Sequence, residues 1–247
     1  MSLAVEGLTV RRRGHPGHRD PVLHDVSFAV AEGSVIGVGG PSGSGKTTLL
    51  MAIAGLVRPS GGRIVVAGVP SSDFRACARV LGYVGSSSAV EDDLTPTEHL
   101  AFHASLRGIG RSQRGGLVAG LIELLALGTW RDTPGRLLTN GLRRRLAIAR
   151  ALVHDPSVVL LDDPAKGLDP AARVDLVDLI AGLSDAGRTV VLAGGDLDDF
   201  APCLTDLAVL ERGRLVAFGE PEAVLGDAHG NRLGISARLL SLSLERA

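Results

Sequence analysis

Aromatic side chains and lysine are both scarce in this chain of 247 residues. Phe, Trp and Tyr supply 3% of it, and only two of its 26 basic residues are lysine, Lys46 and Lys166. Two cysteines, Cys77 and Cys203, are too few for a disulfide framework or a zinc set, so we expect buried thiols. No apolar run approaches the roughly 18 residues that cross a bilayer. The N-terminus also lacks the pattern of a signal peptide. These absences predict a cytoplasmic protein.

An excess of one charge is absent too. The 26 basic side chains are balanced by 27 acidic ones, and the net charge of −1 provides no field that would hold nucleic acid. Hydrophobic residues make up 45% of the chain, which is too apolar for a disordered protein and enough for a sizeable core. We therefore expect a globular protein without a nucleic-acid partner.

Short β-like runs alternate with helical patterns along most of the chain. We expect strands at residues 3–10, 26–30, 34–39, 63–66, 81–84, 158–161 and 189–193, and a hairpin at 207–210 and 214–218. Helices are expected at residues 47–56, 221–225 and 233–244. This alternation predicts an α/β fold with a largely parallel sheet that is covered on both faces.

The middle of the chain follows a different pattern. Residues 87–142 show helical periodicity without a convincing strand, whereas strands occur on both sides of this segment. We therefore expect a single domain over 1–247. Residues 1–86 and 143–247 would form its α/β core, and 87–142 would form an inserted helical subdomain.

A phosphate-binding motif is the strongest local signal. The stretch from Gly40 to Thr47 matches G-x-x-x-x-G-K-[ST], and it lies between an apolar strand and a helix. In that context backbone N–H groups and the helix N-terminus bind phosphates. We expect Lys46 to contact the β- and γ-phosphates of ATP and the Thr47 hydroxyl to bind Mg²⁺. The predicted ATP-binding residues are Gly40, Pro41, Ser42, Gly43, Ser44, Gly45, Lys46, Thr47 and Thr48.

A pair of carboxylates follows the apolar run at residues 158–161. A carboxylate at the edge of a sheet is unfavourable without a counter-charge, so this placement favours a bound cation. We expect Asp162 to hold the metal ion, directly or through water, and Asp163 to face the γ-phosphate. The alternative for each residue is a solvated acid in a loop.

These stretches together resemble the nucleotide-binding domain of ABC transporters. The resemblance rests on GPSGSGKTT at 40–48, LTNGLRRRLAIARAL at 138–152, VVLLDDPAKGLDP at 158–170 and LERGRLVAFGEP at 210–221. They occur in the family's order and spacing, and the similarity covers essentially the whole chain. It implies a P-loop NTPase fold with a RecA-like core of the ABC ATPase type, an antiparallel β region and an inserted helical subdomain.

The resemblance also implies partners. Two ATP-binding domains, identical or different, would pair head to tail, with each ATP between one chain's phosphate loop and the other chain's signature motif. Thr139, Asn140 and Gly141 match that signature, and Asp169 matches the loop that crosses the dimer interface. The helical subdomain would dock on a transmembrane permease, which would hold the chain at the inner face of the cell membrane.

Several chemical positions depart from the family's pattern. Ser86 replaces the glutamine that senses Mg²⁺ and the attacking water, Asp163 replaces the catalytic glutamate, and Gly195 replaces the histidine that clamps the γ-phosphate. In the signature, Asn140 replaces a glycine. Losing one transition-state donor costs about 10²–10³ in rate, and misplacing a base by about 1 Å costs about 10². We therefore expect ordinary ATP affinity and slow hydrolysis.

Some other signals have plainer interpretations. His99 and His103 have the i, i+4 spacing of metal ligands, but no acid follows His99 as H-E-x-x-H requires, so we expect no metal site. We interpret Arg143–Arg145 as a solvated helix face, Lys166 as a surface lysine, and Arg11–Arg19 as a solvated loop. The aromatic residue that stacks on adenine in the family also has no counterpart here. Its region offers only Arg12, Arg13 or His15.

The sequence thus predicts the ATP-binding subunit of an ABC transporter, an ATPase with weak hydrolysis. Because the chain ends soon after residues 219–225, with no regulatory domain of the kind that some importers append, we expect export rather than import. The alternative is a nucleotide-gated module that dimerises or regulates a partner with little hydrolysis. A P-loop small-molecule kinase is disfavoured, since it gives no reason for the segment at 138–152.

Overall fold

The structure is a computed structural model that describes residues 1–11, 21–87, 89–225 and 235. The residues proposed near adenine, Arg12, Arg13 and His15, lie outside the described residues. So does the helix expected at 233–244, apart from residue 235. Within the described part, no helix is both long enough and apolar enough to cross a membrane.

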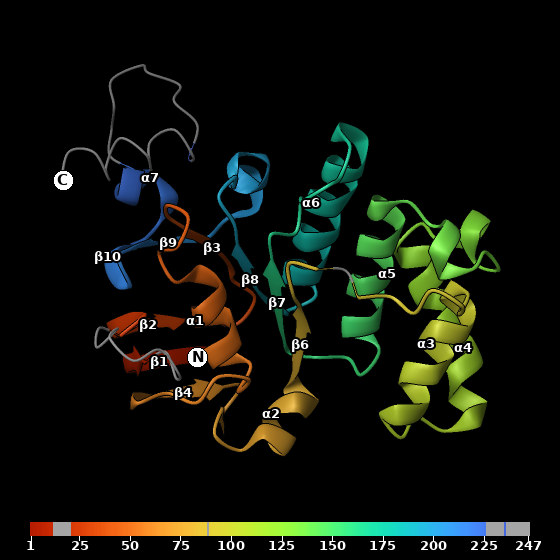
Figure 1. The fold of residues 1–247 in the computed structure, drawn as a ribbon, viewed down its shortest axis with the longest axis horizontal. Helices are drawn as coiled ribbons and strands as arrows, with labels where there is room; N and C mark the ends of the chain where they lie inside the picture. Colours follow the sequence, from red (N-terminus) through yellow and green to blue (C-terminus); the bar gives the residue numbers. More distant parts are fainter. Residues whose placement is uncertain (12–20, 88, 226–234, 236–247) are drawn as a thin grey trace, which may run out of the picture.

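A six-stranded sheet forms the centre of the molecule, in the order β10-β9-β3-β8-β7-β6 (Figure 1). Its inner strands are parallel, and only the edge strand β10 runs antiparallel to its neighbour β9. The strands are β3 (Val35–Gly39), β6 (Leu81–Val84), β7 (Val158–Asp162), β8 (Thr189–Ala193), β9 (Asp206–Glu211) and β10 (Arg214–Gly219). The predicted, largely parallel sheet is confirmed.

A smaller antiparallel sheet packs beside it, in the order β2-β1-β4-β5. Its strands are β1 (Leu3–Val10), β2 (Leu23–Val30), β4 (Gly61–Val66) and the two-residue β5 (Val69–Pro70). Five of its side chains are completely buried, namely Leu3, Leu8, Leu23, Val26 and Val66. They pack in the same core cluster as α1 (Lys46–Ile53), so this sheet and α1 cover one face of the parallel sheet.

Successive residues of the central strands pack into two different hydrophobic cores, one on each face of the parallel sheet. Ile36 and Val38 of β3 belong to the cluster with α1 and the antiparallel sheet, whereas Val35 belongs to the cluster with the remaining helices. β7 divides in the same way, with Leu160 on one side and Leu161 on the other. Strands buried on both faces are continuously apolar, which explains why these runs are recognisable in the sequence.

Helices cover the second face and extend beyond the sheet. They are α3 (Pro96–Leu106), α4 (Arg111–Leu124), α5 (Asn140–Leu152) and α6 (Pro170–Asp185), with short 3₁₀ turns η1 (Gly128–Trp130), η2 (Gly135–Leu137) and η3 (Asp198–Cys203). Figure 1 shows α3 and α4 beside α5, at the end of the molecule opposite β1, β2 and β4. Two shorter helices are α2 (Phe74–Val80) and α7 (Pro221–Leu225).

Local chemistry explains several of these boundaries. Thr95 and Glu98 form a capping box at the start of α3, where each residue bonds the other's backbone N–H. The hairpin predicted at 207–210 and 214–218 turns at Arg212 and Gly213, which both have positive φ, as a tight hairpin needs. The strand expected at 26–30 is longer than predicted and begins at Leu23 as β2. The sequence patterns did not predict α2 or β5.

Candidate functional site

The phosphate-binding loop connects β3 to α1, where the motif predicts it. Gly45 caps α1 with φ of 107°, and a Cβ placed there would lie 2.7 Å from the Leu23 side chain. Gly40 is equally constrained, since its Cβ would lie 2.0 Å from the carbonyl oxygen of Leu210. Both positions therefore require glycine. The N-terminus of α1 is left facing the loop, which is an arrangement suited to an anion.

Lys46 lies on the first turn of α1 and folds back over the loop. Its Nζ donates hydrogen bonds to the carbonyl oxygens of Gly40 at 2.7 Å and Pro41 at 2.9 Å. Burial lowers the pKa of Lys46, and the charges of Asp163 and Asp162 oppose that shift. The ammonium is thus held beside the loop by groups that a phosphate oxygen could replace as acceptors.

Thr47 and Asp162 bring a hydroxyl and a carboxylate together at the ends of α1 and β7. Thr47 Oγ1 donates to Asp162 Oδ1 at 3.2 Å, while Asp162 Oδ2 is buried without a hydrogen-bond partner among the described residues. Burial raises the pKa of Asp162. Oxygen ligands and an orphaned carboxylate oxygen suit Mg²⁺, so this donor pair fits the ion that nucleotide binding implies.

A cavity of about 430 Å³ opens beside these groups. Six of the predicted ATP-binding residues line it, together with Asp163 and Gly195. The predicted nucleotide-binding residues and two of the predicted catalytic positions therefore surround one space. Its lining residues are Val22, Ser42, Gly43, Gly45, Lys46, Thr47, Thr48, Asp163 and Gly195. Sequence reasoning missed Val22, which comes from the antiparallel side of the molecule.

A second cavity of about 460 Å³ shares Val22 and Thr48 with the first. The apolar side chains of Leu56 and Val57 line it beside the basic residue Arg11, and Val10 and Arg58 complete the lining. It therefore offers an apolar space with two guanidinium groups next to the phosphate loop. No sequence motif marks this space, because its walls come from the end of β1, from α1 and the segment that follows it, and from the residue just before β2.

Asp163 follows β7 in a constrained backbone conformation. Its φ is 48°, in the left-handed region that aspartate tolerates better than most residues, and its N–H bonds the Ala193 carbonyl at 2.7 Å. Gly194 and Gly195 lie opposite, after β8. A Cβ at Gly195 would meet no atom within 4 Å, so that position has room for a side chain but supplies none.

The remaining predicted positions lie apart from the cavity. Ser86 is exposed after β6 and is not among the described residues that line it. Thr139 caps α5 by accepting the Leu142 N–H at 3.3 Å, and Asp169 caps α6 by accepting the Ala172 N–H at 2.9 Å. Asn140 and Gly141 open α5 next to the loop that precedes α6. An added Cβ on Gly167 would lie 3.7 Å from that of Asn140.

The prediction that Arg143–Arg145 form a solvated helix face is wrong, most clearly for Arg144. Arg144 is 1% exposed, and its guanidinium donates to the carbonyl oxygens of Gly85 at 2.5 Å, Pro164 at 3.3 Å and Asp162. Burial lowers the pKa of Arg144, and the charges of Asp162 and Asp163 oppose that shift. This side chain therefore joins three segments around the site.

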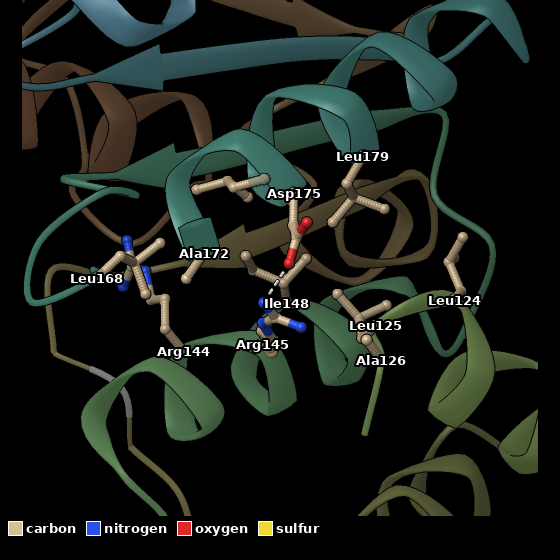
Figure 2. A pocket seen from close by; sticks show the side chains of 11 residues that line it. Leu124, Leu125, Ala126, Arg144, Arg145, Ile148, Leu168, Ala172, Asp175 and Leu179 are labelled. Atoms are coloured by element: carbon tan, nitrogen blue, oxygen red, sulfur yellow. Dashed lines mark hydrogen bonds and ion pairs between the residues drawn. The ribbon is translucent and has the colours of Figure 1, made fainter. Parts of the chain in front are cut away.

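The flanking arginines make ion pairs instead. Arg143 pairs with Asp92, and Arg145 pairs with Asp175 of α6 at 2.6 Å. Figure 2 shows the Arg145 pair beside Arg144, whose side chain points the other way, toward Leu168. The three consecutive arginines thus have three different surroundings, and only the middle one is buried.

The two cysteines are free thiols, and Cys77 is buried as expected, whereas Cys203 is only partly buried. Burial raises the pKa of both. A raised pKa reduces the thiolate fraction, so neither has the character of a nucleophile.

Replacing Lys46 by Met is expected to weaken ATP binding by about 10–100-fold, because it removes charge-assisted hydrogen bonds worth about 1.5–3 kcal/mol. Titration calorimetry with ATP and Mg²⁺ would measure the change. Lys166→Met is the matched control, since Lys166 is the only other lysine in the chain, and its ATP affinity should stay within about twofold of the original. Equal losses in the two variants would contradict the placement of Lys46.

The family model for ABC transporters matches residues 23–166. An ABC transporter ATP-binding protein of Synechocystis is 36% identical over 210 residues, which are 84% of this chain and 59% of that protein. The Nod factor export ATP-binding protein I of Ralstonia nicotianae is 33% identical over 225 residues, or 90% of this chain and 68% of that protein. The chain thus spans about three fifths to two thirds of these relatives.

Solved structures show the same fold. The ATP-binding subunit of an ABC transporter has a TM-score of 0.85 at 23% identity, over 98% of this chain and all of the other. A dimeric ATP-binding cassette bound to ADP and phosphate has a TM-score of 0.79 at 22% identity, over 88% of this chain and 98% of the other. The predicted P-loop NTPase fold of the ABC ATPase type is confirmed.

Proposed function

The chain belongs to the ABC transporter family of ATP-binding proteins, and from this premise we propose that it binds ATP with ordinary affinity and hydrolyses it slowly. The observation that carries the proposal is the contrast within one site. The groups that would hold the nucleotide are complete and close together, whereas the groups that would activate water are shortened or lacking. The site would then bind ATP readily and hydrolyse only a small part of it during each binding event.

The binding groups support the first half of the proposal. The glycine-rich loop runs into the N-terminus of α1, where backbone N–H groups would bind phosphates. Lys46 lies across the loop, where its ammonium would reach the phosphate oxygens. Thr47 and Asp162, already 3.2 Å apart, would hold Mg²⁺. When bound, this ion would neutralise charge that develops on the phosphates.

The catalytic positions support the second half. Asp163 is one methylene shorter than glutamate and its backbone is held by the Ala193 carbonyl, so its carboxylate cannot extend to where a longer side chain would reach. Gly195 brings no donor to the cavity that it lines. Ser86 is short and exposed. Water would therefore be poorly positioned and the developing charge poorly stabilised.

The second cavity is where we place the adenine ring. It adjoins the phosphate cavity through Val22 and Thr48 and is walled by Leu56 and Val57. The guanidinium of Arg11 would stack on the ring in place of an aromatic side chain, since an arginine plane packs well on a flat π system.

We also propose the assembly that this family implies. Thr139, Asn140 and Gly141 would face the ATP of a second domain, Asp169 would lie at the interface, and residues 87–142 would form a helical subdomain that docks on a transmembrane permease. The chain would then work at the inner face of the membrane with residues 1–86 and 143–247 as its ATP-binding core. The dimeric cassette with the same fold supports the pairing.

Export is the direction we propose for the solute. The support comes from relatives, since the matching Ralstonia protein is named for Nod factor export and another, of Escherichia coli, is named "Probable multidrug ABC transporter ATP-binding protein". Reconstitution in vesicles with the cognate permease would show the direction directly, because ATP added on one side should deplete solute from that same side.

The purified chain is expected to turn over ATP about 100-fold more slowly than ordinary family members while binding it normally, because base and donor are both compromised. Steady-state phosphate release tests the slow hydrolysis, and calorimetric titration with ATP tests the ordinary affinity. A turnover in the ordinary range would overturn the claim of slow hydrolysis. Absence of ATP binding would overturn the proposal as a whole.

The replaced catalytic positions also favour a second candidate, a nucleotide-gated module that binds ATP, associates with a partner and barely hydrolyses. Phosphate release with and without the permease distinguishes the two functions. A transporter subunit should be stimulated by its permease, whereas a gated module should show ATP-dependent association with no gain in turnover.

A further inference from the structure

We propose that Glu91, His99 and His103 form a divalent-cation site suited to Zn²⁺. The potential ligand atoms of these three side chains all lie within 4.8 Å of one another. The spacing of the two histidines on α3 is that of metal ligands, and the structure supplies the carboxylate from the segment between β6 and α3. The motif H-E-x-x-H places its acid within the helix, whereas Glu91 lies before the start of α3.

The two imidazoles are adjacent on one face of α3. Their ring centroids are 4.6 Å apart, as expected for side chains one turn apart. His99 is completely buried with its Nδ1 toward Glu91, and Nε2 of His103, the other ring nitrogen that faces Glu91, is buried without a hydrogen-bond partner among the described residues. A buried ring nitrogen without a partner is unfavourable, and a metal ion would satisfy it.

Glu91 provides the third ligand. Its Oε2 lies 2.5 Å from His99 Nδ1, and its Oε1 lies 3.8 Å from His103 Nε2. The Glu91 side chain is 46% exposed and that of His103 is 22% exposed, so an ion could enter from the solvent side. Two histidines and one glutamate, with a position left for water, are a ligand set that binds zinc.

The protonation states agree with this geometry. Burial lowers the pKa of His99 to about 4 and also lowers that of His103, so both rings are neutral near pH 7, as metal binding requires. Burial acts to raise the pKa of Glu91, but its own backbone N–H and the charge of Arg150 lower it overall, so its carboxylate is charged. Arg150 and Arg107 add positive charge nearby, and they would make binding weaker than at a four-ligand structural site.

A bound ion would fasten the segment after β6 to α3. Arg150 of α5 already holds that segment by donating to the Ala89 carbonyl at 2.7 Å. Ser86, which replaces the family's glutamine that senses Mg²⁺ and the attacking water, lies five residues before Glu91. The site is therefore placed to stiffen the connection between the proposed ATP-binding core and the helical subdomain.

The test is metal binding by the full chain, without an affinity tag and without nucleotide, in excess Mg²⁺ to occupy Asp162. We expect one Zn²⁺ per chain by equilibrium dialysis, and Co²⁺ should give the absorption bands of a low-coordinate site. Glu91→Gln and His103→Asn should each raise the dissociation constant at least about tenfold. Zn²⁺ should also raise the melting temperature of the original chain, but not of these variants.

Two controls separate this site from other metal contacts. His24→Asn removes a histidine from β2 and should leave Zn²⁺ binding unchanged. Lys46→Met should bind Zn²⁺ normally even though its ATP affinity falls, so failure of the proposed function and failure of this site are distinguishable. No binding of Zn²⁺, or binding that Glu91→Gln and His103→Asn leave intact, would overturn the proposal.

Discussion

Combining Asp163→Glu with Gly195→His is expected to raise steady-state ATP turnover by about 100-fold or more, because it returns a base of full length and a donor to one cavity. Both positions line the same cavity as Lys46 and Thr47, so the new groups would face the bound phosphates. A side chain at position 195 has open space, since an added Cβ meets no atom within 4 Å. Phosphate release at saturating ATP and Mg²⁺ measures the gain.

The substitution at position 163 has an opposing effect on stability. The φ of 48° there suits aspartate better than glutamate, and we expect a loss of about 1 kcal/mol in the free energy of unfolding. That loss is separate from turnover and is measured by denaturant titration. Because the fold should survive it, a rate that fails to rise could not be attributed to unfolding.

The matched control keeps the histidine and removes the base. Asp163→Gln combined with Gly195→His has nearly the same shape as the glutamate variant at both positions but no carboxylate, and it should show no gain in turnover. A gain in this control equal to that of the glutamate variant would contradict the role assigned to position 163. An unchanged rate in both variants would mean that Ser86, outside the cavity, limits catalysis.

Local patterns in the sequence predicted most of the parallel sheet. The buried strands β3, β7 and β8 are continuous apolar runs because both of their faces are covered, and such runs are visible without tertiary information. The phosphate loop is equally local, since its glycines, Lys46 and Thr47 are consecutive. Predicting the role of Asp162 needed one further inference, which is that a carboxylate directly after a buried strand lies at the sheet's edge and is unfavourable there without a counter-charge.

Features made by distant segments were not predictable in this way. The second cavity joins Arg11, Val22 and Leu56, which share no motif. Glu91 reaches His99 from outside α3, so a search confined to helical spacing could not find it. These contacts depend on how elements pack, and single-sequence patterns carry little information about packing.

Arg144 is different, because the helical periodicity of its surroundings already indicated a buried position. Its charge nevertheless favoured the prediction of a solvated one. The residues three, four and seven positions later, Ala147, Ile148 and Ala151, are apolar and buried, so helical periodicity places Arg144 on the buried face of α5. The run of three arginines favoured a solvated face instead. Buried arginine is rare unless its donors are satisfied, and here three backbone carbonyls satisfy them.

Arg144→Met is expected to reduce the free energy of unfolding by about 3 kcal/mol, since it leaves buried carbonyls without donors and removes a charge that attracts Asp162 and Asp163. The melting temperature should fall by about 6–12 °C. Arg145→Met is the matched control. It breaks only the partly exposed pair with Asp175, so it should cost at most about 1 kcal/mol.

Arg144→Lys separates charge from geometry at the same position. A lysine keeps the positive charge near Asp162 but lacks the planar fork that reaches three carbonyls at once, so we expect it to recover about half of the lost stability. If Arg144→Met proved as stable as Arg145→Met, the buried guanidinium would not be what holds these segments together. Because one of its acceptors is the backbone of Asp162, the Met variant should also bind Mg²⁺-ATP more weakly than Arg145→Met does. A role confined to packing would lower the melting temperature of the Met variant and leave that affinity unchanged.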